Sequence, residues 1–305
     1  MINPIYVVDQ FYASYYAKGG LRMFNFINVF CSRRRWIKRI LINQLDDIAY
    51  VKLKSNGLKI FYNPKDLTGP SFHLAYGLDK GFQNYEEQEK YELLDHIPPN
   101  GVFVDIGANI GMFSLFILGQ RPDITTYSFE PEPQTFKCIS KTKSANQLDH
   151  LNLFPFAIGE ERDELKLYRS IQNDGGHSLI KDIDLKDNIP DELTVKVMPL
   201  DDALPNNLDK IHAIKIDVEG AEESVLKGAI NTIKEHKPLL LIETSNAFLA
   251  KKEVFYQILS ENFPEILFAR LPGSKERLKL SEVSEIAQKR LDQGIEASNY
   301  IFQFI

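Results

Sequence analysis

The sequence is short of several features that mark whole classes of protein. It has only two cysteines, Cys31 and Cys138, in 305 residues, which leaves neither a disulfide framework nor a thiolate zinc cluster. No apolar run approaches the ~18 residues that a membrane-spanning helix needs. The opening residues also lack the basic start, apolar stretch and small-residue cleavage site of a secretory signal. We therefore expect a cytoplasmic protein of a reducing compartment.

An overall excess of positive charge is also missing. The chain has 42 acidic and 36 basic side chains, a net charge of −6, and such a balance is not typical of nucleic-acid-binding proteins. We expect no nucleic-acid partner. The charge is uneven, however, because residues 1–40 contain seven basic side chains and a single acidic one. This asymmetry marks the N-terminal segment as a candidate contact surface.

The basic residues gather at 33–41, which read RRRWIKRIL. In a helix, Trp36, Ile37, Ile40 and Leu41 share one apolar stripe and the cations lie elsewhere. Such a helix could pack as a cap on the rest of the protein, with its basic face solvated. It could also lie on anionic lipid, at the inner face of a membrane. Amphipathicity alone favours the cap, because any surface helix shows it.

Two regions follow from the pattern, an accessory segment at 1–99 and a larger domain at 100–305. In the accessory segment we expect helices over 4–44, a strand pair over 48–62 that turns at Ser55-Asn56-Gly57, an ordered loop region over 63–85 and a polar helix over 86–96.

Strands alternate with helices in the larger domain. We expect strands at 102–106, 125–129, 151–158, 164–169, 194–199, 213–218, 239–243, 266–271 and 299–305. Helices are expected at 111–118, from Pro131 to 147, and at 221–237 and 251–262. This alternation predicts an α/β fold with a doubly wound parallel sheet, whose last strand is antiparallel at the edge.

The first strand–turn–helix unit predicts a nucleotide site. The run VFVDIGANIG at 102–111 follows a strand and opens a helix, where open α/β sheets bind nucleotides. Gly107 allows a tight turn that approaches a ligand, and Gly111 allows close packing of helix on strand. Glu130, at the end of the second strand, can accept hydrogen bonds from both ribose hydroxyls of an adenosine.

The same turn favours one kind of nucleotide over another. A dinucleotide turn needs glycine where this chain has Asn109 and Met112. Asp105, just before the turn, would repel a pyrophosphate and suits a ligand that carries an ammonium and a sulfonium. These residues point to S-adenosylmethionine. A nicotinamide-dependent oxidoreductase is the alternative enzyme, and a cofactor-binding module without turnover is the alternative outside enzymes.

Four runs together resemble the FkbM family of S-adenosylmethionine-dependent methyltransferases: VDIGANIG at 104–111, FEP at 129–131, AIG at 157–159 and IKIDVEGAE at 214–222. The resemblance covers about residues 100–262. It implies a class I methyltransferase (Rossmann-like) fold and, usually, O-methylation of a hydroxyl in a glycan, glycolipid or natural product. From the turn and this resemblance, the expected cofactor-binding residues are Asp105, Gly107, Ala108, Asn109, Gly111, Glu130, Ala157 and Asp217.

Methyl transfer to a hydroxyl needs a base as well as alignment of oxygen, methyl and sulfur. Asp217 ends its strand and Glu243 ends the next, so both are candidate bases at the carboxyl edge of the sheet, and Glu219 lies nearby. His177, in a polar loop, is a rival base because histidine titrates near neutrality. Clustered carboxylates would also permit a divalent metal. No separate ligand spacing in the sequence calls for one, and we expect none.

Overall fold

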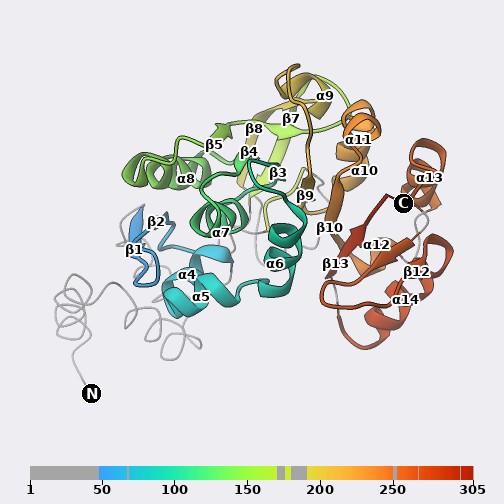
Figure 1. Ribbon diagram of the computed structural model, residues 1–305, viewed down its shortest axis with the longest axis horizontal. Coiled ribbons are helices and arrows are strands. Elements are labelled where there is room, and N and C mark those ends of the chain that lie inside the picture. Colours follow the sequence, from blue (N-terminus) through green and yellow to red (C-terminus); the bar gives the residue numbers. More distant parts are fainter. Residues whose placement is uncertain are drawn as a thin grey trace.

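The computed structural model describes residues 48–66, 69–169, 176–179, 191–249, 253–266, 268–295 and 297–304. Its centre is an eight-stranded sheet with the strand order β12-β11-β13-β10-β9-β3-β4-β5 (Figure 1). Five neighbouring strands of this sheet are parallel: β3 (Val102–Ile106), β4 (Thr125–Phe129), β5 (Leu151–Phe154), β9 (Ala213–Ile216) and β10 (Leu239–Ser245). The three others are β11 (Phe268–Arg270), β12 (Leu278–Lys279) and β13 (Ala297–Phe302).

Helices cover both faces of this sheet, and its central strands are accordingly buried on both sides, with mostly apolar residues on each. One core contains residues of α4 (Pro70–Gly77), α5 (Asp79–Asn84), α6 (Glu87–His96), α7 (Met112–Gln120) and α8 (Pro133–Asn146). The other contains residues of α9 (Leu200–Ala203), α10 (Glu222–Lys227), α11 (Ile230–His236), α12 (Asn246–Leu249), α13 (Glu253–Asn262) and α14 (Leu280–Asp292). The predicted doubly wound α/β fold is confirmed.

Two smaller sheets flank the large one. The predicted strand pair is confirmed as β1 (Ala49–Lys52) and β2 (Lys59–Tyr62), which are antiparallel. β2 packs on α8, where the amide of Phe61 donates to Thr142 Oγ1 at 2.9 Å. The second small sheet has the order β6-β8-β7, from β6 (Ala157–Ile158), β7 (Asp163–Arg169) and β8 (Asp191–Met198).

Several predicted boundaries were wrong for local reasons. The expected loop over 63–85 contains α4 and α5, and α4 starts at Pro70, which is well placed in a first helical turn. The expected strand 151–158 is two strands in different sheets, divided at Pro155, which has no amide for a ladder. The expected helix 221–237 is α10 and α11, separated at Gly228, where a Cβ would overlap the carbonyl of Gly159.

The end of the chain also differs from expectation. β13 is antiparallel, as predicted, but it lies between β10 and β11, and β12 continues the sheet beyond them. Helix α14 was not predicted, and α8 begins at Pro133 and not at Pro131. The expected helices over 4–44, and with them the basic run 33–41, lie outside the described residues. No helix within the described ranges is both long enough and apolar enough to cross a bilayer.

Candidate functional site

The turn after β3 lies at the point where the strand order of the sheet reverses, because β4 lies on one side of β3 and β9 on the other. Ligands of open α/β sheets bind in the crevice at such a point. Gly107 has φ +77°, and a Cβ on it would overlap the carbonyl oxygen of Asp217. Glycine is therefore required here twice, for its left-handed backbone and for the close approach of the loop that follows β9.

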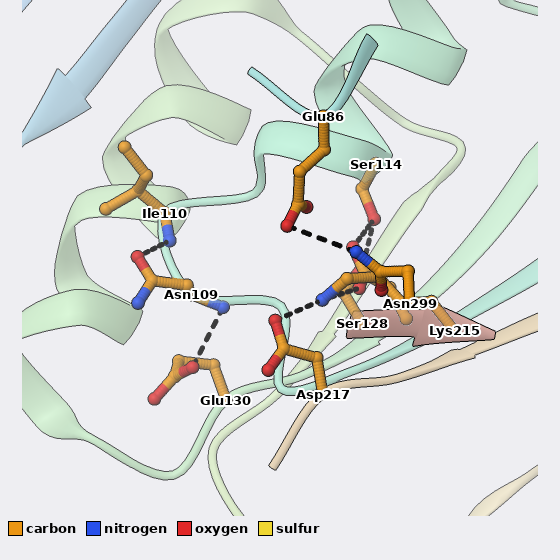
Figure 2. A network of polar contacts seen from close by, with 10 residues as sticks. Glu86, Asn109, Ile110, Ser114, Ser128, Glu130, Lys215, Asp217 and Asn299 are labelled. Carbon is orange, nitrogen blue, oxygen red and sulfur yellow. Dashed lines mark hydrogen bonds and ion pairs between the residues drawn. The ribbon is translucent and has the colours of Figure 1, made fainter. Parts of the chain in front are cut away.

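The backbone amides of this turn are all engaged inside the protein. Gly107 N and Ala108 N donate to Phe129 O at 3.0 Å each. Asn109 N donates to Glu130 Oε2 at 2.9 Å, and Ile110 N donates to Asn109 Oδ1 at 2.6 Å (Figure 2). A pyrophosphate site needs free amides at such a turn. These four leave none, so the turn does not offer the phosphate contacts of a dinucleotide fold.

Glu130 closes the other side of this crevice at the end of β4. Its side chain accepts from two amides, Asn109 N at 2.9 Å and Glu132 N at 2.8 Å, and the residue is 6% exposed. Burial raises the pKa of Glu130 to about 8. Each carboxyl oxygen has a further lone pair, so the group can still accept hydrogen bonds from a ligand's hydroxyls.

A cavity of about 210 Å³ brings most of the predicted site residues together. Its lining includes Gly107, Ala108, Asn109, Glu130, Ala157, His177, Asp217 and Glu243. Asp105 and Gly111 do not line it. Asp105 is fully buried beneath the cavity, where it accepts from Ser114 Oγ at 2.6 Å. A Cβ on Gly111 would come within 2.6 Å of Ile139, so this glycine serves the close packing of α7 against α8.

Asp217, Glu219 and Glu243 form an acidic wall of the cavity, and a buried lysine, Lys215, also lines it. Lys215 Nζ lies 2.8 Å from Asp217 Oδ2 (Figure 2), and Lys215 is 3% exposed. The neighbouring Asp217 charge, together with burial, raises the pKa of Glu243 well above its ordinary value. Burial, with help from Asp217, raises the pKa of Glu219 to about 8. Among the described residues, no group of three or more His, Cys, Asp or Glu is placed to hold a metal ion.

His177 lines the same cavity from a different element. Its neighbour Ser178 forms a β-bridge with Tyr168 of β7 and donates to Glu219 O at 2.6 Å, which fixes this short segment. Burial lowers the pKa of His177, so the imidazole is neutral near pH 7 and able to accept a proton. The structure thus brings the three candidate bases, Asp217, Glu243 and His177, to one cavity.

The sequence reasoning missed part of this site. Lys215 was not expected in it, although residues two apart on a strand point to one face and the lysine precedes Asp217 by two. His73 also lines the cavity, and its ring lies 5.4 Å from that of Tyr85, another lining residue. His73 comes from a segment read as a loop, and nothing in its spacing marked it. Glu86, next to Tyr85, points toward the Lys215–Asp217 pair (Figure 2).

Comparisons with known proteins agree with this geometry. The profile of the methyltransferase FkbM domain matches residues 105–268. The 31-O-demethyl-FK506 methyltransferase FkbM of Streptomyces tacrolimicus is 30% identical over 43% of this chain and 60% of its own. Methyltransferase 1 of Beauveria bassiana is 31% identical over 43% of this chain and 59% of its own. The chain thus spans about three fifths of the length of these two relatives.

Other similarities are more distant. The 2-O-methyltransferase NoeI of Sinorhizobium fredii is 26% identical over 58% of this chain and 77% of its own. Among solved structures, an FkbM methyltransferase from Methylobacillus flagellatus is 18% identical, with a TM-score of 0.42, over 78% of this chain and 56% of its own.

Proposed function

Because the chain belongs to the FkbM methyltransferase family, we propose that it is an S-adenosylmethionine-dependent O-methyltransferase. The proposed acceptor is a hydroxyl of a carbohydrate, a glycolipid or a related natural product. One observation carries the proposal: the cavity at the switch point pairs Glu130 with a turn whose amides are all engaged. This arrangement suits an adenosine without a phosphate. Two relatives are named for O-methylation, which supports oxygen as the atom that is methylated.

The residues of the cavity fit this cofactor. Gly107 lets the turn after β3 approach the loop after β9 closely at the edge of the cavity, and the carboxyl oxygens of Glu130 can accept from the two ribose hydroxyls. We expect the backbone of Ala157 beside the adenine. The acidic wall favours a ligand with positive charge, because Lys215, the cation in the lining of this cavity, is already paired with Asp217.

S-adenosylmethionine, when bound, supplies a methyl group on a sulfonium centre, open to attack by a hydroxyl oxygen. In this proposal Asp217 accepts the proton of that hydroxyl, and Lys215 holds the Asp217 carboxylate in place through the 2.8 Å contact. Glu243 keeps a proton more readily than an ordinary glutamate, because the Asp217 charge and burial raise its pKa. It can therefore donate a hydrogen bond to the acceptor, or take over as base when it is ionised.

Calorimetric titration with S-adenosylmethionine, and with NAD in parallel, tests the cofactor. We expect saturable binding of S-adenosylmethionine and none of NAD. Glu130→Ala should weaken binding about tenfold or more, since it removes two hydrogen bonds to the ribose hydroxyls. Glu164→Ala is the control, because Glu164 is exposed on β7. Tight binding of NAD, or no binding of S-adenosylmethionine, would refute the proposal.

Turnover separates an enzyme from a cofactor-binding module without activity. We would incubate the protein with S-adenosylmethionine and a panel of neutral and lipid-linked sugars, and detect S-adenosylhomocysteine by mass spectrometry. An acceptor-dependent product supports the enzyme. Binding without any product across the panel would favour the module.

We also propose a cytoplasmic location, with peripheral contact to an anionic membrane through residues 33–41. This rests on the basic amphipathic sequence alone. Sedimentation with phosphatidylglycerol vesicles tests it, with phosphatidylcholine vesicles as the control. The combined change Arg33→Ser, Arg34→Ser and Arg35→Ser should release the protein from the anionic vesicles, and equal sedimentation of both proteins would contradict the contact.

A further inference from the structure

Two polar side chains reach the acidic wall from outside the region that matches the family profile. Glu86 precedes α6 and Asn299 lies in β13, whereas the match covers 105–268. Asn299 Nδ2 lies 3.4 Å from Glu86 Oε1, and Asn299 is the cross-strand partner of Glu243. Figure 2 shows the Glu86 carboxyl pointing toward Asn299 and toward the Lys215–Asp217 pair. These two segments thus meet beside Glu243 and the Lys215–Asp217 pair.

Each of these side chains has a buried oxygen with no hydrogen-bond partner in the described part of the protein, Oε2 of Glu86 and Oδ1 of Asn299. A buried polar atom without a partner is unfavourable, and such atoms are rare unless a ligand or water completes them. Glu86 also has a left-handed backbone, with φ 45° and ψ 49°. That conformation is uncommon outside glycine, and strain of this kind gathers at functional sites.

The chemistry of these two unpartnered oxygens restricts the kind of ligand that could form hydrogen bonds with them. Asn299 Oδ1 is an acceptor, because Asn299 uses its amide nitrogen on Glu86. Burial raises the pKa of Glu86 to about 7, so its carboxyl accepts when ionised and can donate when protonated. A hydroxyl, which both donates and accepts, can therefore complete either atom. An anionic ligand would also meet Asp217, Glu219 and Glu243, with Lys215 as the compensating cation beside them. A phosphate or carboxylate is disfavoured here, whereas a neutral group with adjacent hydroxyls has a hydrogen-bonding group for each of the two oxygens.

We propose that Glu86 and Asn299 form an acceptor subsite that binds neighbouring hydroxyls of a neutral polyol. This rests on the methyl-transfer function proposed above, and it names the class of acceptor. The subsite lies beside Asp217 and Glu243, so a polyol held there places a further hydroxyl near the candidate bases. Because both residues lie outside the matched region, the subsite would give this chain a specificity of its own within the family.

Saturation-transfer NMR tests the subsite with the full-length protein and S-adenosylhomocysteine. The neutral probes are methyl α-D-mannopyranoside, methyl α-L-rhamnopyranoside and myo-inositol. Glucosamine and glucose 6-phosphate represent cationic and anionic ligands. We expect at least one neutral probe to bind at tens of millimolar or below. Glu86→Ala and Asn299→Ala should each weaken that binding about tenfold, as expected for a lost hydrogen bond to a charged or buried group.

Matched variants separate a binding role from a structural one. Glu87→Gln changes the exposed neighbour of Glu86 and should leave binding of the probe unchanged. Glu86→Gln keeps the shape of the side chain if Glu86→Ala fails to fold, and thermal melting checks both. Binding of glucose 6-phosphate or glucosamine in place of the neutral probes, no binding of any neutral probe, or unchanged binding in the Glu86 and Asn299 variants would each overturn the subsite.

The same samples distinguish this proposal from the one it rests on. Calorimetry with S-adenosylmethionine should give the same affinity in the native protein and in the Asn299→Ala variant. If the cofactor binds but the probe results fail, the subsite is wrong and the proposed function stands. If the native protein does not bind the cofactor, the proposed function itself is wrong.

Discussion

Lys215 Nζ lies 2.8 Å from Asp217 Oδ2 and 4.0 Å from Asp105 Oδ1, so one buried cation lies between a buried aspartate and an aspartate that lines the cavity. Burial by itself would lower the pKa of Lys215, but the two aspartates outweigh it and keep the amine charged. The centroid of the Phe113 ring lies 4.8 Å from Nζ, within the range of a cation–π contact. The lysine therefore compensates two carboxylates that have little other neutralisation.

Replacing Lys215 with Met should destabilise the protein strongly. The change leaves Asp105 buried without a cation, and loss of one partner from a buried pair costs about 3–5 kcal/mol. Lys227→Met is the control, because its ion pair with Glu160 is largely exposed and should contribute less than ~1 kcal/mol. Urea denaturation measures both free energies of unfolding. Similar losses in the two variants would contradict the buried role of Lys215.

Asp217→Asn should abolish most turnover while cofactor binding survives. Loss of a positioned base costs about 10²–10⁴-fold in rate. We expect smaller losses in Glu243→Gln and His177→Gln, whose side chains line the same cavity. Steady-state kinetics with calorimetry on the same samples separates turnover from cofactor affinity. A larger loss in His177→Gln than in Asp217→Asn would assign the base to the histidine.

The sequence was informative where a motif ties a residue type to a backbone position. Gly107 and Glu130 could be predicted because a tight turn after a strand and an acid at the end of the next strand are both needed for an adenosine site. Asp217 and Glu243 followed from strand ends at one edge of the sheet. Their burial and their coupling to each other could not be predicted, because both depend on which groups share the cavity.

The rest of the site depends on contacts between segments far apart in sequence. Glu86 and Asn299 are in contact although they lie 213 residues apart in the sequence, and no local pattern predicts such a pair. His73 lies in α4, a helix whose residues are apolar on most sides, so periodicity gave no helical signal. Asp105 was expected to contact the cofactor from its place before the turn. Its burial under Ser114 and Lys215 became visible only with the packing of α7 on β3.

The protein without ligands should lose stability as the pH rises from about 5 to about 8.5. Burial raises the pKa of Glu130 from 4.5 to about 8, so between these values the folded state holds a proton that the unfolded chain has released. The contribution is fully present below pH 4.5 and is lost as the pH passes 8. Each such proton lowers the free energy of unfolding by up to ~1.4 kcal/mol per pH unit.

Glu130→Gln isolates this contribution. The amide does not titrate, so the fall in melting temperature between about pH 5 and 8.5 should be smaller than in the native protein, and Glu164→Gln, on the exposed side of β7, should follow the native protein. Differential scanning fluorimetry across the pH range measures the slopes. An equal slope in Glu130→Gln and the native protein would show that Glu130 is already ionised in the folded state.

Gly107→Ala should damage the site far more than the same change at Gly57. Both glycines have a left-handed backbone, with φ +77° and φ +78°, so alanine carries the same conformational cost of about 1–2 kcal/mol at each. A Cβ at Gly57 meets nothing within 4 Å, whereas at Gly107 it overlaps the carbonyl of Asp217. The free energy of unfolding, measured by urea denaturation, should therefore fall by about 2 kcal/mol or more beyond the loss in Gly57→Ala. This excess measures how closely the loops after β3 and β9 approach each other. Cofactor affinity should fall in Gly107→Ala alone, and equal stability of the two variants would mean that this approach is looser than the structure has it.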